Sequence, residues 1–533
     1  MSDFDTIIQG GTIIDGTGKP RFQMDIGIKK NHIDAIGDLS KVCSQNIIDA
    51  TGLIVSPGFI DIHSHSDRTL VDDGGAESKI HQGVTTEVVG NCSFSSFPIA
   101  KDRGTSISRS HRSKVKYDWT DLDGFSNFLE KRGISVNIAH QLGHSALRGA
   151  VGLLDNRPPN PDELDSMKRL AVESIEQGAF SLTTGLTLVP SCYAKTDEIV
   201  EIAKAIAHFP GCFYATHARL WANMHVEAVD EAIRVGADAK IPVQYSHMAI
   251  IDSRLFDHPE IMLKPFEKAR AEGQDVTYDM YPYIAAGTHL SQLLPEWVQE
   301  GGINKMLSRI RNPNLRKKAL LSLKLGWFKG LPWEWDKIII SFVNSEKNTS
   351  LVGKSIEDIA KEFKKESIDV FLQLIDEESN QVGCIMINRR EDNIQYFMQQ
   401  SYAMFGSDGN AISKSGIYSQ DKPHPRYYGC YPRIFGRYVR EKSVLSLEEA
   451  VYKSTGFPAW RMNFQKRGTL KVDNYADIII WNPDSIIDKS TFQDPHHYAE
   501  GIHYVLVNGI EVVKKGKHTG KRPGRVIRRG NNN

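Results

Sequence analysis

The sequence predicts an α/β protein: a (β/α)₈ TIM-like barrel, a small β-sandwich built from both chain ends, and a lid subdomain inserted before the last barrel strand. Three observations predict this arrangement. Short apolar runs recur along the chain with amphipathic stretches between them, both ends show strand-like alternation, and one interval is too long for an ordinary connection. With 533 residues, 40% of them hydrophobic, the chain is long enough for a large core and a satellite domain.

The two chain ends are expected to form one sheet domain. FDTIIQGGTIID is an apolar run broken at Gly10 and Gly11, and MDIGIKKNHIDAIG continues with strand-like alternation. YADIIIWNP and YVLVNGIEVVKKG have the same pattern near the C-terminus, where Asn508-Gly509 is a hairpin-turn dipeptide. Because an isolated hairpin is not stable, we expect residues 1–57 and 467–533 to combine, which leaves residues 58–466 for the barrel.

Eight apolar runs supply the expected barrel strands. They occupy residues 59–65, 85–91, 135–141, 179–185, 212–218, 242–248, 275–283 and 402–409. Amphipathic stretches such as PDELDSMKRLAVESIEQ and TDEIVEIAKAIAHF lie between several of them. Fully apolar strands that alternate with helices are typical of a parallel sheet, and eight such units predict a closed barrel.

The long interval before the last run predicts an insertion at about residues 290–400. It begins with the helix-like stretch LSQLLPEWVQEGGINKMLSRI and continues through an aromatic segment, WFKGLPWEW, to an expected strand, KIIISFV. Because barrel insertions of this kind emerge at the catalytic face, we expect a lid or a wall of a substrate pocket. A purely structural insert is the alternative. A smaller Ser/Arg-rich loop at residues 101–119 interrupts the unit after the second strand.

The charge balance argues against a polyanionic partner. The chain has 65 Lys and Arg residues and 65 Asp and Glu residues, so its net charge is zero and no overall electrostatic field draws it to nucleic acid or to an acidic membrane surface. The basic tail from Lys514 to Arg529 is the local exception, and we expect it to be a solvated last strand with loosely ordered ends. The expected partner is therefore a small molecule.

Cysteine usage and the N-terminus predict a cytoplasmic protein. Six cysteines lie far apart without a CxxC motif, which favours reduced thiols. The first residues, MSDFDTIIQGGTIID, carry acids where a signal peptide has a basic segment, and the sequence has no long apolar run.

Metal-competent side chains follow the expected strand ends, which share one face of a barrel. They are His63, His65, Cys92, His217, His247 and Asp408. Each alone has an ordinary structural explanation, but together they predict a metal site. Imidazole and thiolate are suitable ligands for Zn²⁺, and a zinc ion lowers the pKa of a water molecule bound at its open coordination position to about 7. Four further histidines near strand ends are candidates for supporting or structural roles: His81, His140, His144 and His289.

Several segments resemble the D-aminoacylase (N-acyl-D-amino-acid deacylase) branch of the amidohydrolase superfamily, over nearly the whole chain. They are GFIDIHSHSD, GVTTEVVGNCSFS, FYATHAR, VQYSHM, YPYIAAGT, FGSDG and KPHPRYYGCYPRIFGRYVRE. The resemblance implies a tightly bound zinc ion on Cys92, His217 and His247. It also implies a second metal position, often filled only weakly, that shares Cys92 and adds His63, His65 and Asp408. The thiolate takes the place of the carboxylated lysine of many superfamily members.

The expected reaction is zinc-dependent hydrolysis of a C–N amide bond, most simply of an N-acyl-D-amino acid. Asp408 matches the catalytic aspartate and would act as general base and then general acid; a role as a plain ligand or turn cap is the alternative. Arg426 and Tyr281 match positions that the family uses near the substrate. Arg219 is a further base for a substrate carboxylate.

Two positions depart from the family and keep a second substrate class open. Ala249 stands where D-aminoacylases have a lysine that contacts the substrate carboxylate, and Gly287, followed by Thr288, stands where a serine serves the same group. An unpaired carboxylate in a closed pocket costs free energy. The alternative is therefore a ring-opening hydrolase of a cyclic amide, similar to hydantoinase or dihydropyrimidinase. A metal-free, non-enzymatic scaffold is a third interpretation.

Overall fold

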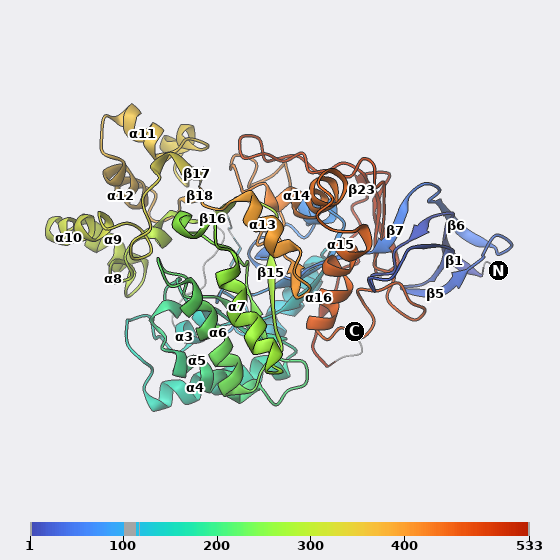
Figure 1. The fold of residues 1–533 in the computed structure, drawn as a ribbon, viewed down its shortest axis with the longest axis horizontal. Coiled ribbons are helices and arrows are strands. Elements are labelled where there is room, and N and C mark those ends of the chain that lie inside the picture. Colours follow the sequence, from blue (N-terminus) through green and yellow to red (C-terminus); the bar gives the residue numbers. More distant parts are fainter. Residues whose placement is uncertain (1–2, 101–112, 114, 117, 531–533) are drawn as a thin grey trace.

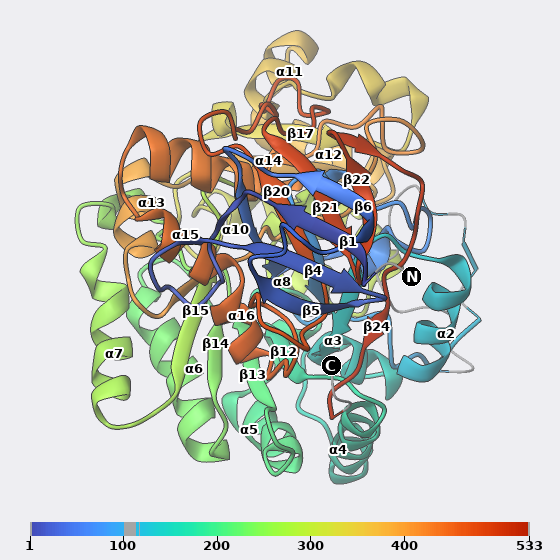
Figure 2. The same ribbon diagram turned by 90° about the vertical axis from the view of Figure 1, so that its right-hand side faces the viewer.

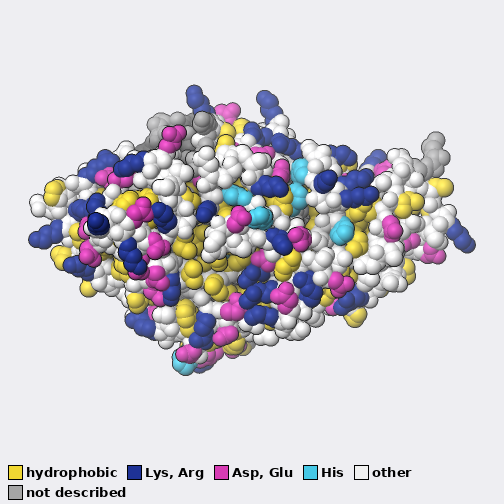
Figure 3. Space-filling view, turned by 90° about the horizontal axis from the view of Figure 1, so that it is seen from above, with side chains coloured by type: hydrophobic (Ala, Val, Ile, Leu, Met, Phe, Trp, Pro, Cys, Tyr) yellow, Lys and Arg dark blue, Asp and Glu magenta, His cyan; other side chains and the backbone are white. Residues whose placement is uncertain are grey.

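The computed structural model describes residues 3–100, 113, 115, 116 and 118–530, so most of the Ser/Arg-rich loop at 101–119 lies outside the described residues. The molecule is elongated (Figure 1): the N-terminal strands lie at one end, helices α8 to α12 (residues 296–377) lie at the other, and parallel strands with their helices lie between. Basic and acidic side chains are interspersed on the face shown in Figure 3, as the balanced composition predicts.

Each of the eight apolar runs overlaps a strand. These strands are β8 (Phe59–Asp61), β9 (Val84–Val89), β10 (Asn137–His140), β12 (Ser181–Gly185), β13 (Phe213–His217), β14 (Val243–Tyr245), β15 (Val276–Met280) and β19 (Ala403–Phe405). They pair in parallel within two sheets, in the order β24-β10-β9-β8 and β11-β12-β13-β14-β15-β19, where β24 is Val526–Ile527 and β11 is Leu142–Gly143. The expected mixed α/β fold with buried parallel strands is confirmed.

Four successive helices pack side by side against the second parallel sheet. They are α4 (Pro161–Glu176), α5 (Thr196–Ile206), α6 (His225–Ala239) and α7 (Glu260–Ala271). In α4, Asn160 and Glu163 form a capping box and Pro161 occupies the first turn, where its missing N–H costs nothing. Met167, Ala171 and Ile175 form its buried stripe at the helical spacing of four residues. The remaining helices around these sheets are α1 (Glu77–Ile80), α2 (Leu122–Arg132), α3 (His144–Ala150), α13 (Glu391–Met398), α14 (Arg426–Arg433), α15 (Leu447–Ser454) and α16 (Gly456–Arg461).

The chain ends share a sheet. Its N-terminal strands are β2 (Thr12–Ile13), β3 (Phe22–Gln23) and β7 (Ile54–Pro57), and its C-terminal strands are β20 (Ile478–Trp481), β21 (Ile502–Val507), β22 (Ile510–Lys514) and β23 (Lys517–His518). The two groups join where β20 runs antiparallel to β7. Figure 2 shows N-terminal strands (blue) and C-terminal strands (red) in the same part of the molecule. Asn508 and Gly509 turn between β21 and β22 with positive φ, as a two-residue hairpin requires.

A second sheet of N-terminal strands covers this one. It contains β1 (Phe4–Gln9), β4 (Asp25–Lys29), β5 (His32–Gly37) and β6 (Ser44–Asp49) in the order β5-β4-β1-β6. Isoleucines from both sheets form one buried cluster that includes Ile8, Ile28, Ile478 and Ile480. Gly10 and Gly11 therefore do not close a hairpin but carry the chain from β1 in one sheet to β2 in the other.

The basic tail is more ordered than expected. Beyond β23, β24 (Val526–Ile527) pairs in parallel with β10, and both of its side chains are buried. Arg528 contacts the carboxylate of Asp123 and the carbonyl of Gln177, which fixes the strand. The expectation of loosely ordered ends was therefore wrong, because two apolar residues among arginines are enough to extend an existing parallel sheet.

The insertion has a hydrophobic core of its own. It contains an antiparallel sheet of β16 (Ala285–His289), β18 (Gly383–Ile387) and β17 (Ile338–Phe342), with helices α8 (Glu296–Gln299), α9 (Ile303–Arg311), α10 (Pro313–Leu323), α11 (Ile356–Phe363) and α12 (Ser367–Glu377). Its buried residues form a cluster separate from that of the parallel sheets. Across the described residues, the helices are too short or too polar to span a membrane.

Candidate metal centre

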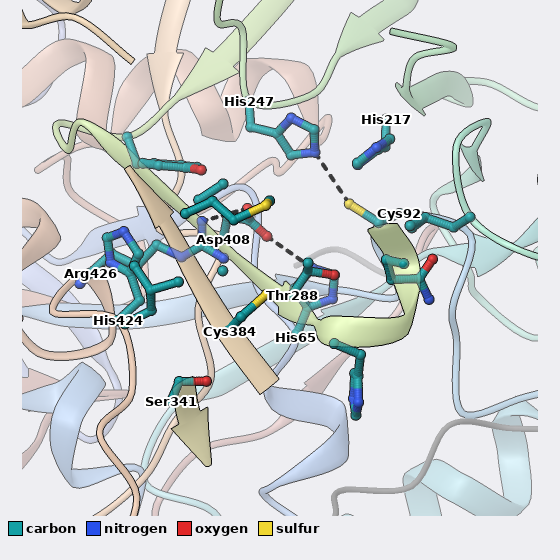
Figure 4. Close-up of a pocket in the computed structure, with 18 of the residues that line it drawn as sticks. His65, Cys92, His217, His247, Thr288, Ser341, Cys384, Asp408, His424 and Arg426 are labelled. Atoms are coloured by element: carbon teal, nitrogen blue, oxygen red, sulfur yellow. Dashed lines mark hydrogen bonds and ion pairs between the residues drawn. The ribbon is translucent and has the colours of Figure 1, made fainter. Parts of the chain in front are cut away.

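The six predicted metal-competent residues lie in two adjoining groups of donors. Figure 4 shows five of them, His65, Cys92, His217, His247 and Asp408. One group of donors comprises His63, His65, Cys92 and Asp408, and a second comprises Cys92, His217 and His247. Within each group all ligand atoms lie within 4.8 Å of one another. Cys92 belongs to both groups, so the arrangement is a pair of adjoining sites that share one sulfur atom.

The donors come from the ends of five parallel strands. His63 and His65 follow β8, Cys92 follows β9, and His217 is the last residue of β13. His247 follows β14 and Asp408 follows β19, so strands far apart in the sequence deliver their side chains to one edge of the sheets.

Three of the donors have strained backbone conformations. Cys92, His247 and Asp408 have φ values of 52°, 39° and 50°, in the left-handed region that non-glycine residues rarely adopt. Each such residue costs on the order of 1–3 kcal/mol, and such strain concentrates at functional sites. The turns therefore hold the three side chains toward a common point at the expense of local stability.

Glycines allow the strand ends to approach one another. Gly90 has a φ of 85°, and a Cβ atom on it would lie 2.2 Å from the carbonyl oxygen of Gln141. A Cβ atom on Gly406 would lie 2.5 Å from the Cβ atom of His63 and 2.9 Å from its backbone nitrogen. The end of β19 can therefore lie directly beside the histidine pair only because residue 406 has no side chain.

Short distances connect the donors within each group. His63 Nε2 lies 3.3 Å from Cys92 Sγ and 3.6 Å from Asp408 Oδ1, and His65 Nε2 lies 3.0 Å from the same Asp408 oxygen. In the second group, Cys92 Sγ lies 3.5 Å from His247 Nε2. The His217 and His247 rings are 4.6 Å apart.

Asp279, at the end of β15, orients two of the histidines. Its Oδ1 lies 3.0 Å from His63 Nδ1 and accepts a hydrogen bond from the backbone N–H of His247 at 2.8 Å, while Gln244 donates to Oδ2 at 3.1 Å. A carboxylate on the far ring nitrogen fixes the tautomer and the orientation of a ligating imidazole. The sequence analysis missed Asp279; the signal was the second of the two acids in DVTYDMYPY, which lies inside the apolar run and not at its start.

Burial sets the protonation of three of the four donor imidazoles, whereas Asp279 and Cys92 outweigh burial and raise the pKa of His63. Burial lowers the pKa of His65 and of His217 to about 4, and it lowers the pKa of His247 well below its ordinary value. These rings are therefore neutral near pH 7, and their lone pairs are available to a cation. Burial also raises the pKa of the Cys92 thiol.

Asp408 is ionised despite its burial. Burial works to raise the pKa of its carboxyl group, but the Arg426 guanidinium and the hydrogen bond from His65 outweigh it and hold the pKa well below the usual range. Arg426 Nη1 lies 2.8 Å from Asp408 Oδ2, and His65 occupies Oδ1. The carboxylate is thus oriented on both oxygen atoms and carries a negative charge at neutral pH.

The donor set fits zinc. Thiolate and imidazole are the ligands that Zn²⁺ prefers in proteins, and three such ligands around one ion leave a position open for water or substrate. Cys92, His217 and His247 form such a group, and His63, His65 and Asp408 supply nitrogen and oxygen donors next to it.

A cavity of about 270 Å³ opens beside these donors. Tyr281 and Arg426, both predicted near the substrate, line it, and Ala249 and Gly287, the positions that depart from the family, line it too. The insertion contributes a largely apolar part of the wall: Trp327, Phe328, Ser341, Phe342, Cys384, Ile385 and Met386.

Arg219 does not contribute to this cavity. Its guanidinium binds Glu231 of α6 and the carbonyl oxygens of Cys192 and Ala194, and it is absent from the cavity wall. These contacts satisfy its donors within the protein. The prediction that Arg219 binds a substrate carboxylate therefore gains no support from these contacts, because acceptors within the protein already bind its guanidinium.

The four further histidines have different surroundings. His144 contacts Ser191 and Glu198, His81 stacks on Tyr498, and His289 lines the cavity. His140 is buried beside aromatic rings at the end of β10. His144 therefore has the partners that the sequence did not reveal.

His140 is expected to make the stability of the fold dependent on pH. Burial, with a smaller effect of the Arg528 charge, lowers its pKa to about 3 from an ordinary value of 6.5. A histidine with a lowered folded-state pKa stabilises the fold above its unfolded pKa, and this contribution is lost as the pH falls through the window between the two values. We expect this one group to remove about 2 kcal/mol of unfolding free energy between pH 7.5 and pH 5.

Urea unfolding of the metal-free protein at both pH values, with His140→Gln alongside, measures this effect. The variant should lose less stability on acidification than the wild type. Equal losses in the two proteins would show that His140 is protonated in the folded state.

Comparisons with known proteins agree with this geometry. The profile of the amidohydrolase family matches residues 46–279 and 416–513. A D-aminoacylase from Alcaligenes xylosoxydans xylosoxydans is 32% identical over 99% of this chain and 98% of its own length. An N-acyl-D-glutamate deacylase from the same organism is 31% identical over 98% of this chain and 96% of its own.

Solved structures show the same relationship. N-acyl-D-glutamate deacylase from Bordetella bronchiseptica, complexed with zinc and a phosphonate inhibitor, has a TM-score of 0.84 at 29% identity and covers 98% of this chain and 99% of its own. A D-aminoacylase with a binuclear metal centre has a TM-score of 0.83 at 32% identity, with 99% and 100% covered. The dihydropyrimidinase from Brevibacillus agri, with a TM-score of 0.57, 15% identity and 98% of both chains covered, shares the fold alone. The chain therefore belongs to the amidohydrolase family, in the branch that contains D-aminoacylase and the N-acyl-D-amino-acid deacylases.

Proposed function

We propose that this chain is a zinc-dependent amidohydrolase that converts an N-acyl-D-amino acid, or a related N-acyl compound, to a carboxylate and an amine. The observation that carries the proposal is the pair of donor groups sharing Cys92, with the ionised Asp408 at their edge and a cavity beside them. Relatives that match over nearly the whole chain include D-aminoacylase and N-acyl-D-glutamate deacylase.

Cys92, His217 and His247 would hold one zinc ion, and His63, His65 and Asp408 would complete a second position through the shared sulfur. Zinc bound there supplies Lewis-acid and water-activating chemistry. All six donors converge in this chain, so a metal-free scaffold is not favoured.

Asp408 would move the protons of the reaction. Its carboxylate accepts a proton from the attacking water as the water oxygen bonds to the amide carbon, and it returns that proton to the nitrogen as the C–N bond breaks. His65 and Arg426 hold the two carboxylate oxygens in place. The ion pair with Arg426 also keeps the carboxyl group ionised, which a general base requires.

The proposed architecture places this chemistry at one end of a closed barrel formed by residues 58–466. Gln141 joins β10 to β11, so the two parallel sheets continue into each other, and Ser64 bridges in parallel to Gly409 next to the opposite edge strands. The two terminal sheets, residues 1–57 and 467–533, would form a β-sandwich. The insertion at about residues 290–400 would act as a lid or a fixed wall, since its side chains line the cavity.

Ring opening of a cyclic amide is the second candidate function. Ala249 and Gly287 leave the cavity wall without two partners for a substrate carboxylate, and this observation favours a substrate that lacks one. The metal centre would serve either reaction, because both reactions hydrolyse a C–N amide bond.

A substrate panel separates these functions. The zinc-loaded protein is assayed with N-acetyl-D-amino acids, their L-enantiomers, and cyclic amides of the hydantoin and dihydropyrimidine type. We expect hydrolysis of N-acetyl-D-amino acids. Turnover of cyclic amides alone would favour the second function, and no turnover of any amide would overturn both.

The proposed setting is the cytoplasm, with a small-molecule substrate as the partner. All six cysteines are free, five of them buried, which suits a reducing compartment. Neither a nucleic acid nor a membrane is required by the proposed reaction.

A further inference from the structure

Arg389 lies in the wall of the cavity at a position fixed by the insertion sheet. Arg389 lies two residues after Ile387, the last residue of β18, and Ile387 pairs with Ala285 of β16. The backbone N–H groups of Asn388 and Arg389 both donate to the carbonyl oxygen of Ile284, at 3.2 and 3.0 Å. The segment is thereby tied to the chain that leaves β15, and its side chains reach the cavity.

The guanidinium of Arg389 has an aromatic support but no carboxylate. It lies 4.2 Å from the centre of the Tyr281 ring, and Arg426 lies 4.6 Å from the same ring centre. Arg389 Nε is buried and, like Arg426 Nε, has no hydrogen-bond partner in the part of the chain that the structure describes. Among the described residues no carboxylate lies within 4.0 Å of Arg389, whereas Arg426 is paired with Asp408. A cation held in a cavity wall without a counter-charge is a binding group for an anion.

The two departures from the family lie in the same cavity wall. Residue 249 is a buried alanine, and a Cβ atom on Gly287 would lie 3.8 Å from Arg426 Nη2. Among the described residues, the Lys and Arg side chains that line the cavity are Arg68, Arg389 and Arg426. Arg426 neutralises Asp408, whereas neither Arg68 nor Arg389 has a carboxylate partner among those residues. Arg68 lies over the Phe94 ring, and Arg389 shares the Tyr281 ring with Arg426, so Arg389 is the cation without a carboxylate that lies beside the partner of Asp408.

We propose that Arg389 binds the substrate carboxylate and so determines specificity, replacing the lysine whose position is Ala249. This inference rests on the proposed function and names its substrate class: N-acyl compounds with a carboxylate next to the scissile amide. The planar guanidinium offers two parallel N–H donors to a carboxylate, and Tyr281 holds its plane. The substrate carboxylate would then be held from a different direction than in relatives that have the lysine and the serine.

Kinetics with matched substrates test this assignment. The substrates are the best N-acetyl-D-amino acid of the panel and the same compound without its carboxylate; for leucine these are N-acetyl-D-leucine and N-(3-methylbutyl)acetamide. Arg389→Met should raise KM for the acid and lower kcat/KM by about 10- to 100-fold, the loss typical of a charged hydrogen-bond partner. The neutral amide should change by less than about threefold, and zinc content should not change.

The adjacent arginine provides a matched control. Arg390 is partly exposed, binds Asp257 and the carbonyl oxygen of Phe256, and does not line the cavity. Arg390→Met should leave both substrates unaffected. Adding Ala249→Lys to Arg389→Met should restore part of the lost kcat/KM for the acid, which a structural role of Arg389 does not predict.

The outcomes distinguish this inference from the proposed function. Equal kcat/KM of Arg389→Met and wild type for the acid overturns the inference and leaves the function standing. Equal losses for the acid and the neutral amide overturn it as well, because they indicate a structural effect. If the wild type hydrolyses neither compound, the proposed function and this inference fall together.

Discussion

Replacement of Asp408 by asparagine is expected to lower kcat for an N-acyl substrate by about 10²- to 10⁴-fold, the contribution of a positioned general base. Asparagine keeps the shape of the side chain and one oxygen atom but cannot accept the proton of the attacking water. Steady-state kinetics of the zinc-loaded variant, with zinc content measured on the same sample, give the effect. Zinc on Cys92, His217 and His247 should stay bound, because Asp408 is not in that group.

Asp257→Asn is the control for this substitution. Asp257 is exposed, pairs with Arg390 on the surface and does not line the cavity, so its loss should change kcat by less than about twofold. Full activity of Asp408→Asn would exclude a proton-transfer role for this carboxylate. Loss of zinc from Asp408→Asn would instead indicate that Asp408 is a ligand of the tightly bound ion.

Cys92→Ala is expected to abolish both metal binding and activity. The sulfur atom is the one donor common to both groups, so its removal leaves two nitrogen ligands in one group and three nitrogen or oxygen ligands in the other. Metal analysis of the variant after dialysis against trace zinc should show far less than the wild-type content, and hydrolysis should fall with it.

Cys212→Ala separates this effect from a general loss of packing. Cys212 is also a buried free thiol, but it lies in the hydrophobic core and not among the candidate ligands. The Cys212→Ala variant should lose some stability, as expected when a buried small hydrophobic residue is truncated, and should keep its zinc. Zinc retained at the wild-type level in Cys92→Ala would reduce Cys92 to the same structural role.

The strands and the six donors were predictable because both depend on local pattern. Each parallel strand is buried on both faces, and its residues form a short run that is rich in apolar and β-branched side chains, even where a buried polar residue such as Glu87 or Asp279 interrupts it. Once the runs are identified, the C-terminal ends of parallel strands must lie at one edge, so His63, Cys92, His217 and His247 are brought together by topology alone. The shared role of Cys92 came from the family resemblance, and the donor distances agree with it.

Other contacts depend on which of several partners a side chain reaches, and no local pattern encodes that choice. Asp279 contacts His63 across 216 positions of sequence, and β24 adds to β10 across almost four hundred. Arg219 could have faced the cavity, but Glu231 lies close enough to bind it first. Arg426 was expected at the substrate and lies on Asp408, which leaves Arg389, a residue without a motif, facing the cavity.

Zinc titration of the metal-free wild-type protein tests the central claim most directly. Zinc is added in steps, and hydrolysis of an N-acetyl-D-amino acid and bound metal are measured on the same samples. The structure predicts no hydrolysis before zinc is added. The rate of hydrolysis should then rise and saturate at about one zinc ion per chain, held by Cys92, His217 and His247. Full hydrolysis by the metal-free protein, or stoichiometric zinc binding that activates no amide hydrolysis, would contradict it.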